Sequence, residues 1–291
     1  MSLLTTLLGD PPPAWAFEIS ESGIAFGRTE APEQLSFRPL PEGAISVSPL
    51  RDNVQQPEVL AREVAALAPP PNGHRLRAAL ILPDYCARTA VLDFDSFPSD
   101  KDEQRALVRF RMKKTVPFEL ESAVVSYFQQ PAGSGAKIDV VVALIPVEIV
   151  ARYEAPFRSA GFQPGEVVTS SLAALHMVEP NGITMIAKLG GATLSVMVLR
   201  GPVLKLARCV ELTDATSEEI LSVLHPTVAY VEDELRARPE RLLLCGFGRT
   251  TDEEAPFLQA ELGVPVEALR SRFGTPVWTN AGLLGYMESL A

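Results

Sequence analysis

Three short turns rich in small residues each follow an apolar, strand-like run, and they are the segments best suited to bind a ligand. They read SESG (20–23), GGAT (190–193) and GFGRT (246–250). Backbone N–H groups in such turns can converge on one anion, which is how many proteins hold phosphate. Three turns in corresponding places favour a phosphate site more than any one alone. The candidate binding residues are Ser20, Ser22, Gly23, Lys188, Gly190, Gly191, Thr193, Gly246 and Gly248.

Lys188 stands just before the second turn, where a phosphate-transferring site often carries an acid that holds magnesium. Magnesium takes oxygen ligands, so a lysine can neutralise phosphate but cannot coordinate the metal. The patterns GxxxxGK[ST] and GxGxxG are both absent. The second turn is therefore open to three interpretations: a nucleotide loop, a loop that has lost its nucleotide, or a plain hairpin.

Other kinds of active or metal site are not indicated by the sequence. His74, His176 and His225 lie far apart, and HExxH, CxxC and HxH are absent, so no metal site is expected. GxSxG is absent too, and Ser170 and Ser171 are expected to cap a helix. No catalytic residue is predicted.

Composition places the chain among globular proteins with a large core. It has 291 residues, of which 47% are hydrophobic, and a formal net charge of −10. Nonspecific nucleic-acid binding is not expected, because it needs a basic face. Cys86, Cys209 and Cys245 show no CxxC spacing, and buried, reduced thiols in a cytosolic protein are expected.

The sequence contains no apolar run of the roughly 18 residues that a membrane span needs. Its start lacks the basic region and the cleavage site of a secretory signal. Leu3, Leu4, Leu7 and Leu8 could form one apolar helical turn, which is either a frayed or clipped terminus or a weak membrane or partner contact. A cytoplasmic location is expected, with the membrane reached only through a partner.

Apolar periodicity predicts strands mixed with helices throughout the chain. A strand, a tight turn and a second strand begin near Ala14 and again near Met185. This repetition predicts a duplicated α/β fold with two facing domains, and the cleft between them is the usual place for a ligand. Helices are expected at 57–68, 100–115, 147–162, 171–178, 217–238, 253–262 and 280–291, with strands between them.

The predicted helix at 100–115 is strongly basic toward its end. Ser99 or Asp100 should cap it, and acids in its first turn with lysines in its last suit the helix dipole. The basic residues form either a solvated face or a contact for a partner or phospholipid. They are Arg105, Arg109, Arg111, Lys113 and Lys114.

The chain resembles the PilM family of type IV pilus assembly, in the actin-like ATPase superfamily. The resemblance rests on a strand ending in Leu82–Pro83, a strand at 90–97, the helix at 100–115, "VPFELE" (116–121) and the Tyr127 strand. "LGGATLSVMVLRG" and "LLLCGFG" are also in register, so the likeness covers nearly the whole chain. FtsA and the cytoplasmic domain of the type II secretion L protein are similar in layout.

This resemblance implies an α/β, actin-like (ribonuclease H-like, duplicated) fold with two domains and an inserted small α+β subdomain. The expected ranges are 1–76 with 163–180 for the first domain, 77–162 for the insert and 181–291 for the second domain. It also implies ATP in the cleft between the domains. The implied partner is the short N-terminal peptide of a PilN-like inner-membrane protein, lying against the insert and its neighbour, together with other pilus assembly proteins.

Several family features of the nucleotide site are altered. Where the family's two phosphate loops begin Asp-Ile-Gly, this chain has Glu18-Ile19-Ser20 and Lys188-Leu189-Gly190. The family's Ala-Glu-x-x-Lys helix, which helps to hold the nucleoside, is replaced by the short segment 213–217. Phosphoryl transfer relies on positioned charge and metal, so the resemblance implies a degenerate site.

The resulting hypothesis is a pseudo-ATPase: a cytoplasmic adaptor of a type IV pilus or type II secretion-like system that binds a partner peptide without ATPase activity. ATP binding without hydrolysis stays open. The first alternative is an active ATP-binding relative that uses Lys188 in place of the acid. The second is a sugar or acetate kinase of the same superfamily, for which no catalytic aspartate stands out.

Overall fold

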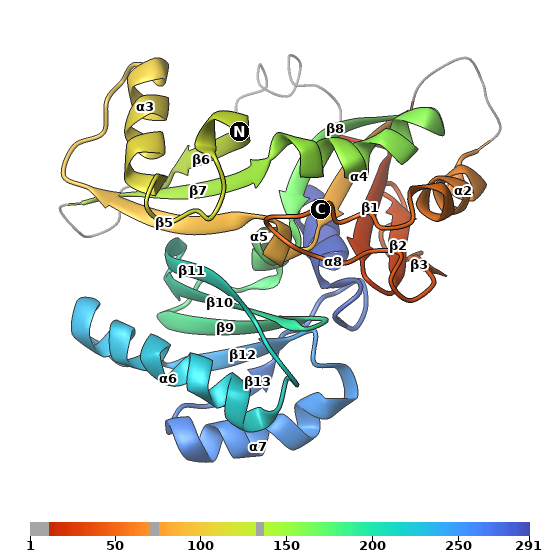
Figure 1. The fold of residues 1–291 in the computed structure, drawn as a ribbon. Coiled ribbons are helices and arrows are strands. Elements are labelled where there is room, and N and C mark those ends of the chain that lie inside the picture. Colours follow the sequence, from red (N-terminus) through yellow and green to blue (C-terminus); the bar gives the residue numbers. More distant parts are fainter. Residues whose placement is uncertain (1–11, 70–75, 132–136) are drawn as a thin grey trace.

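The computed structural model describes residues 12–69, 76–131 and 137–291, which form three β-sheets with helices on their faces (Figure 1). The leucine-rich start and His74 lie outside the described residues. The first sheet has the strand order β3-β2-β1-β4-β8. Its strands are β1 (Trp15–Ser20), β2 (Gly23–Arg28), β3 (Ser36–Pro39), β4 (Leu76–Leu82) and β8 (Phe162–Thr169).

The second sheet, ordered β11-β10-β9-β12-β13, repeats the topology of the first. In each, three strands run antiparallel and two further strands continue parallel to the first of them. The duplicated α/β architecture expected from the sequence is therefore confirmed. The strands are β9 (Ile183–Gly190), β10 (Thr193–Arg200), β11 (Val203–Glu211), β12 (Arg241–Cys245) and β13 (Val266–Ala268).

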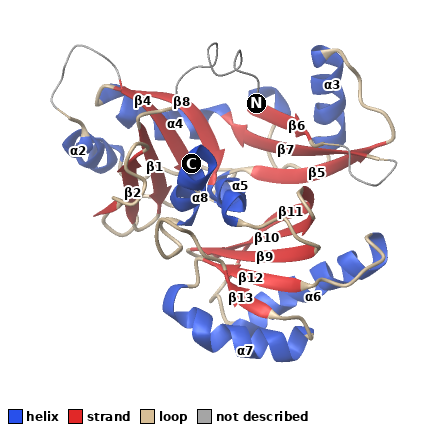
Figure 2. Cartoon of the chain, turned by 180° about the vertical axis from the view of Figure 1, so that it is seen from behind, coloured by secondary structure: helices blue, strands red, loops and turns tan. Residues whose placement is uncertain are grey.

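Helices cover both faces of the first sheet, so its strands are apolar on both sides. Alternation along β1 sends Phe17 and Ile19 toward α2 (Pro57–Leu67) and α4 (Val147–Ser159). The other face packs against α5 (Ser170–Ala174) and α8 (Ala281–Leu290), seen between the sheets in Figure 2. The short helix η3 (Leu175–Met177) follows α5 and packs on α8. Glu18 lies between Phe17 and Ile19 and therefore points to this second face.

The second sheet is packed in the same two-sided way. Met185 and Ala187 join the core under α6 (Ser217–Glu234) and α7 (Thr251–Leu262). Ile186 points to the opposite face, where it packs with α5 and α8 residues. Lys188, two residues further along β9, therefore also points toward the first sheet.

The third sheet, ordered β5-β7-β6, forms a small layer with one helix on it (Figure 1). Asp100 caps that helix by accepting hydrogen bonds from the backbone N–H groups of Asp102 and Glu103, both at 3.0 Å. The cap is thus Asp100, one of the two predicted residues. The elements are β5 (Arg88–Phe94), α3 (Lys101–Met112), β6 (Ala123–Gln129) and β7 (Ile138–Pro146), with η1 (Asp84–Cys86) and η2 (Leu120–Ser122) beside them.

The sheets divide the chain differently from the ranges expected from the sequence. β4 pairs between β1 and β8, and α4 packs on α2, so both ends of the predicted insert 77–162 belong to the first sheet's layers. The third sheet itself spans 88–146. α8, expected within 181–291, packs on α5. β3 was not expected, because its four residues are all exposed and show no apolar alternation.

Candidate functional site

The first two predicted turns meet where the two large sheets face each other. A Cβ atom built on Gly191 would lie 3.2 Å from Oε2 of Glu21, which places the second turn against the first. The first two turns therefore lie next to each other. Four of the predicted residues line one small cavity here: Ser20, Lys188, Gly190 and Thr193.

The remaining predicted residues take structural places outside this cavity. Ser22 and Gly23 lie against β3, where a Cβ on Gly23 would come within 2.3 Å of a backbone oxygen. Gly246 has φ +82°, and a Cβ there would lie 2.4 Å from the carbonyl oxygen of Leu189, so only glycine fits. Gly248 begins the short helix η4 (Gly248–Thr250).

The hydroxyl groups of the turns close the turns themselves. Ser20 Oγ donates to the carbonyl of Gly23 at 3.0 Å. Thr193 Oγ1 donates to the carbonyl of Gly190 at 2.8 Å. Both hydroxyl protons are therefore donated within the hairpins, and neither is free to bind a phosphate oxygen.

Lys188 is buried, with 2% of its surface exposed, and it joins the two halves of the molecule. Its Nζ lies 3.0 Å from Oδ2 of Asp84, which begins η1, two residues after the last residue of β4 in the first sheet. Ser195 Oγ donates to the same oxygen at 3.0 Å. A buried lysine needs such a counter-charge, because an unpaired charge in the interior is very costly.

The other carboxylate oxygen of Asp84 holds the start of α5. Oδ1 accepts a hydrogen bond from the backbone N–H of Ser171 at 2.6 Å. Thr169 is the residue at the N-cap position, but its side chain makes no capping bond. Ser170 and Ser171 were predicted to cap this helix, and that prediction is wrong, because Asp84 reaches across from η1 and accepts from the amide of the helix's second residue.

Glu18 is a second buried carboxyl group beside Lys188. It accepts hydrogen bonds from the hydroxyl of Ser170 and, at 2.7 Å, from the backbone N–H of Leu283. Burial raises the pKa of Glu18, while Lys188 and the hydrogen bonds lower it in part. Burial lowers the pKa of Lys188, but the charges of Asp84 and Glu18 outweigh it and hold that pKa above its ordinary value. Lys188 is therefore charged at neutral pH.

The cavity between the turns has a volume of about 20 Å³. Pockets for small molecules span roughly 300–1,000 Å³, so this space holds no nucleotide in the observed arrangement. Glu18, Glu21 and Asp84 also line it, which makes its walls more acidic than basic. In the described residues no cluster of His, Cys, Asp and Glu suited to a metal ion is found.

Asp84 and Glu18 were not among the predicted site residues. A signal existed in the sequence, since Asp84 comes two residues after the last residue of β4 and Glu18 interrupts the apolar run of β1. A charged residue inside a buried strand needs a partner. Which partner it finds depends on how the sheets pack, so the pairing could not be seen in the sequence.

The segment 213–217, expected from the resemblance to replace a nucleoside-binding helix, is a tight turn closed by hydrogen bonds. Glu219 accepts hydrogen bonds from the backbone N–H groups of Thr213, Asp214 and Ala215, at 2.7, 3.1 and 3.0 Å. These bonds lower the pKa of Glu219. Thr216 caps α6 by accepting from the N–H of Glu219 at 3.2 Å. The chain thus passes directly from β11 into α6.

The free thiols occupy the interior as expected, with Cys209 less covered than predicted. Cys86 and Cys245 are buried and Cys209 is partly buried. Burial raises the pKa of all three, in the case of Cys209 and Cys245 to about 12. Their sulfur atoms are therefore protonated at neutral pH, as in structural cysteines.

Two of the basic residues on α3 are used inside the third layer. Arg109 donates to the carbonyls of Leu120 and Ala123, and Arg111 donates to that of Asp93. Lys113 and Lys114 lie exposed at the end of the helix. Whether this face meets a partner or lipid stays a prediction.

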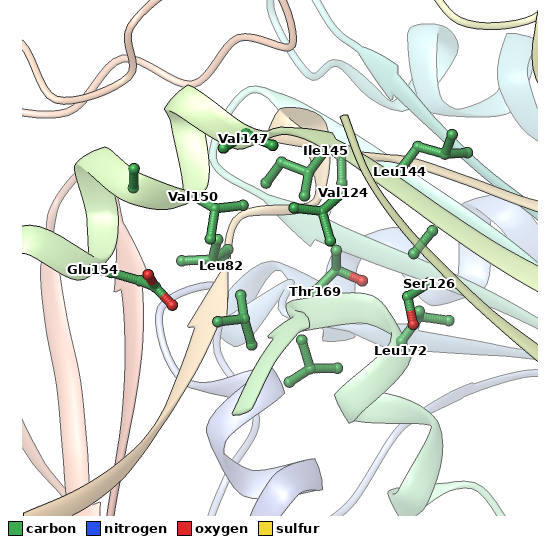
Figure 3. Close-up of a pocket in the computed structure, with 15 residues that line it drawn as sticks. Leu82, Val124, Ser126, Leu144, Ile145, Val147, Val150, Glu154, Thr169 and Leu172 are labelled. Atoms are coloured by element: carbon green, nitrogen blue, oxygen red, sulfur yellow. The ribbon is translucent and has the colours of Figure 1, made fainter. Parts of the chain in front are cut away.

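A second, larger hollow lies between the third sheet and the first. It is an apolar groove of about 470 Å³, framed by β6, β7, α4, β8 and α5 (Figure 3). Val124, Val147 and Val167 on its walls are 43%, 48% and 38% exposed, which is unusual for large apolar side chains. Sequence patterns had not indicated the groove, because four separate segments of the chain build it.

Few polar side chains interrupt this apolar surface. Figure 3 shows the carboxylate of Glu154 on one side of the groove and the hydroxyl groups of Thr169 and Ser126 on the other. Thr169 is 6% exposed, and its Oγ1 is buried without a hydrogen-bond partner among the described residues. Arg158 binds one oxygen of Glu154, Oε2, at 2.8 Å.

Comparisons with known proteins show which solved structures share this fold. No family model and no curated sequence matches the chain. A chain of a PilM–PilN type IV pilus biogenesis complex matches with a TM-score of 0.72 and 20% identity, over 97% of this chain and 99% of that one. No helix in the described residues is long and apolar enough to span a bilayer.

Two further structures share the fold at lower similarity. One is a Bacteroides thetaiotaomicron protein with an actin-like ATPase fold, at TM-score 0.52 and 13% identity, covering 87% and 89% of the two chains. Another is the cytoplasmic domain of EpsL from the Vibrio cholerae type II secretion system, at 0.51 and 11%, covering 95% and 94%. The chain therefore has the actin-like ATPase fold, and the likeness to PilM seen in its sequence extends over nearly its whole length.

Proposed function

We propose that this protein is a cytoplasmic, actin-like adaptor of a type IV pilus or type II secretion-like system. It binds a short N-terminal peptide of a PilN-like inner-membrane protein and reaches the membrane through that partner and other assembly proteins. It does not hydrolyse ATP. The observation that carries the proposal is the open apolar groove between the third sheet and the first, beside a nucleotide cleft that is filled.

The groove supports peptide binding through its shape and its lining. Its walls leave Val124, Val147 and Val167 unusually exposed. Exposed apolar surface of this kind marks binding sites on proteins that are otherwise well packed. The similar chain of known structure is part of a PilM–PilN complex, which makes a PilN-like peptide the first partner to test.

The cleft supports a protein without ATPase activity. Lys188 occupies the place of a metal-holding acid, and its charge is already paired with Asp84. The cavity is about 20 Å³, and the connection after β11 is a closed turn. Phosphoryl transfer needs positioned charges and a metal ion. Here the charges of Lys188 and Asp84 are paired with each other across the two sheets.

Peptide binding is tested with labelled synthetic peptides from the cytoplasmic N-termini of PilN-like proteins, using fluorescence polarisation. Ala151 lies exposed on α4 and lines the groove, so Ala151→Trp should fill it and weaken binding by at least about tenfold. Ala106→Trp places the same ring on an exposed position of α3 and should leave binding unchanged. Failure of every such peptide to bind the wild-type protein would refute the adaptor role.

Nucleotide binding is tested by calorimetry with ATP and magnesium. We expect no magnesium-dependent binding by the wild-type protein. Lys188→Asp should not create it, because that substitution leaves the shortened connection after β11 unchanged. Tight, magnesium-dependent binding by the wild-type protein would instead support the alternative of an active ATP-binding relative.

A further inference from the structure

We infer that the groove selects an extended peptide segment that carries a positively charged group beside an apolar run. Glu154 binds the charged group, and Thr169 hydrogen-bonds to the segment further along. This inference rests on the proposed function, because it names the chemistry of the peptide that the same groove takes. Two polar groups in the groove carry it: the Thr169 hydroxyl, which has no hydrogen-bond partner among the described residues, and the Glu154 carboxylate, of which one oxygen is paired with Arg158.

Thr169 gives the first observation. Its Oγ1 is buried and unpaired among the described residues, and it lines the groove. Buried hydroxyl groups nearly always have a hydrogen-bond partner, so an orphan in a binding groove points to a group that the ligand supplies. Ser126 also lines the groove and lies on the same side of it in Figure 3.

The reason for this unpaired hydroxyl lies in the neighbouring cleft. A threonine at an N-cap normally accepts a hydrogen bond from the second or third amide of its helix. Here Asp84 takes the N–H of Ser171 at 2.6 Å, and Thr169 makes no capping bond. Asp84 is held in turn by Lys188 at 3.0 Å. The interdomain ion pair therefore positions the carboxylate that takes one of the two amides available to a Thr169 cap.

Glu154 gives the second observation. Its carboxylate is the acidic group on an otherwise apolar groove wall, and its side chain is 18% exposed. Arg158 pairs with Oε2 from the next turn of α4, which leaves Oε1 without an ion pair among the described residues. Arg158 is half exposed and can stay in place while a second cation binds Oε1. A carboxylate in this setting favours a cation over a neutral group.

The strands around the groove favour an extended ligand. β6 is at one edge of the third sheet and β8 at one edge of the first, within the described part of the chain. An edge strand offers unpaired backbone groups that an incoming peptide strand can use. A peptide also presents side chains alternately, so it can place apolar groups against Val124 and Val167 and polar groups between them.

The test compares short synthetic peptides that share one apolar run and differ at a single flanking residue, which is Arg, Gln or Glu. The wild-type protein should prefer Arg to Gln by roughly tenfold. Glu154→Gln should abolish that preference, and Glu154→Lys should reverse it toward Glu. Acetylating the peptide N-terminus distinguishes a side-chain cation from the terminal amine.

The Thr169→Val variant tests the hydroxyl with almost no change of shape. It should weaken all binding peptides by about three- to tenfold without changing the Arg preference. Equal binding of the Arg, Gln and Glu peptides to the wild-type protein would overturn the inference and leave the adaptor role standing. Failure of the PilN-like and designed peptides alike would overturn both.

Discussion

The interdomain cleft and the apolar groove differ in how their polar atoms and their space are used. In the cleft, the buried Lys188 is paired with Asp84, and the buried Glu18 accepts a hydrogen bond from the backbone. The cavity that remains is about 20 Å³. In the groove, about 470 Å³ is open and the hydroxyl of Thr169 has no partner among the described residues. The cleft therefore has paired charges and little free space, whereas the groove has the open volume and the unpaired hydroxyl group expected of a binding surface.

The symmetry of the fold sharpens this comparison. Glu18 and Lys188 occupy corresponding places, each two residues before the turn residue that pairs across its hairpin. In a duplicated fold, two acids at these places could share a metal ion between the sheets. Here one is a lysine, whose charge lowers the pKa of Glu18 in part and pairs directly with Asp84. A buried ion pair between the sheets can hold them in a fixed arrangement without a bound nucleotide.

The largest expected effect comes from removing the cation of the cleft. Lys188→Met leaves Asp84 and Glu18 buried without their counter-charge and should lower the free energy of unfolding by about 3–5 kcal/mol. Urea denaturation of the variant and of the wild-type protein measures this change in the free energy of unfolding. Lys205→Met is the matched control, because Lys205 pairs with Asp139 at 2.5 Å in a more exposed setting and should cost less. Equal losses would mean that burial does not distinguish the cleft pair.

A second prediction concerns the pH dependence that Glu18 imposes. Its pKa is raised above the ordinary value of 4.5, so the folded state binds a proton more tightly than the unfolded state does. Protonation of Glu18 therefore adds to the free energy of unfolding below pH 4.5. This contribution is lost as the pH rises through the folded-state pKa. Glu18→Gln should remove this loss.

Denaturation of the wild-type protein and of Glu18→Gln across the acidic to neutral range checks this prediction. The variant should gain stability relative to the wild type as the pH rises, since glutamine keeps the shape and the amide contact with Leu283. Parallel stability curves would show that Glu18 titrates alike in both states.

The smallest expected effect comes from the groove. Thr169→Val removes a buried hydroxyl that has no partner, so the free energy of unfolding should be unchanged or higher by up to about 1 kcal/mol. Thr184→Val is the matched control, because the Thr184 hydroxyl donates to Asn181 and accepts from Arg241. The control should be destabilised. A comparable loss in Thr169→Val would mean that its hydroxyl is paired in solution.

Much of the fold could be predicted from local patterns. The hairpin turns at 20–23 and 190–193, the helix cap at Asp100 and the duplicated strands follow from glycine placement and apolar periodicity. The limits of the insert could not be predicted, because β4 and α4 carry no mark that says which sheet they join. β3 also escaped prediction, since four exposed residues form a strand only through pairing with β2.

By itself, the sequence determined that Lys188 stands in a buried strand before a glycine turn and that the chain resembles PilM. Only the tertiary structure decided that Lys188 meets Asp84, which lies 104 residues earlier, and that Asp84 also takes an amide available to a Thr169 cap. The physical reason is that periodicity assigns each side chain to a face of its own element. Which charges and hollows face one another depends on how those elements pack.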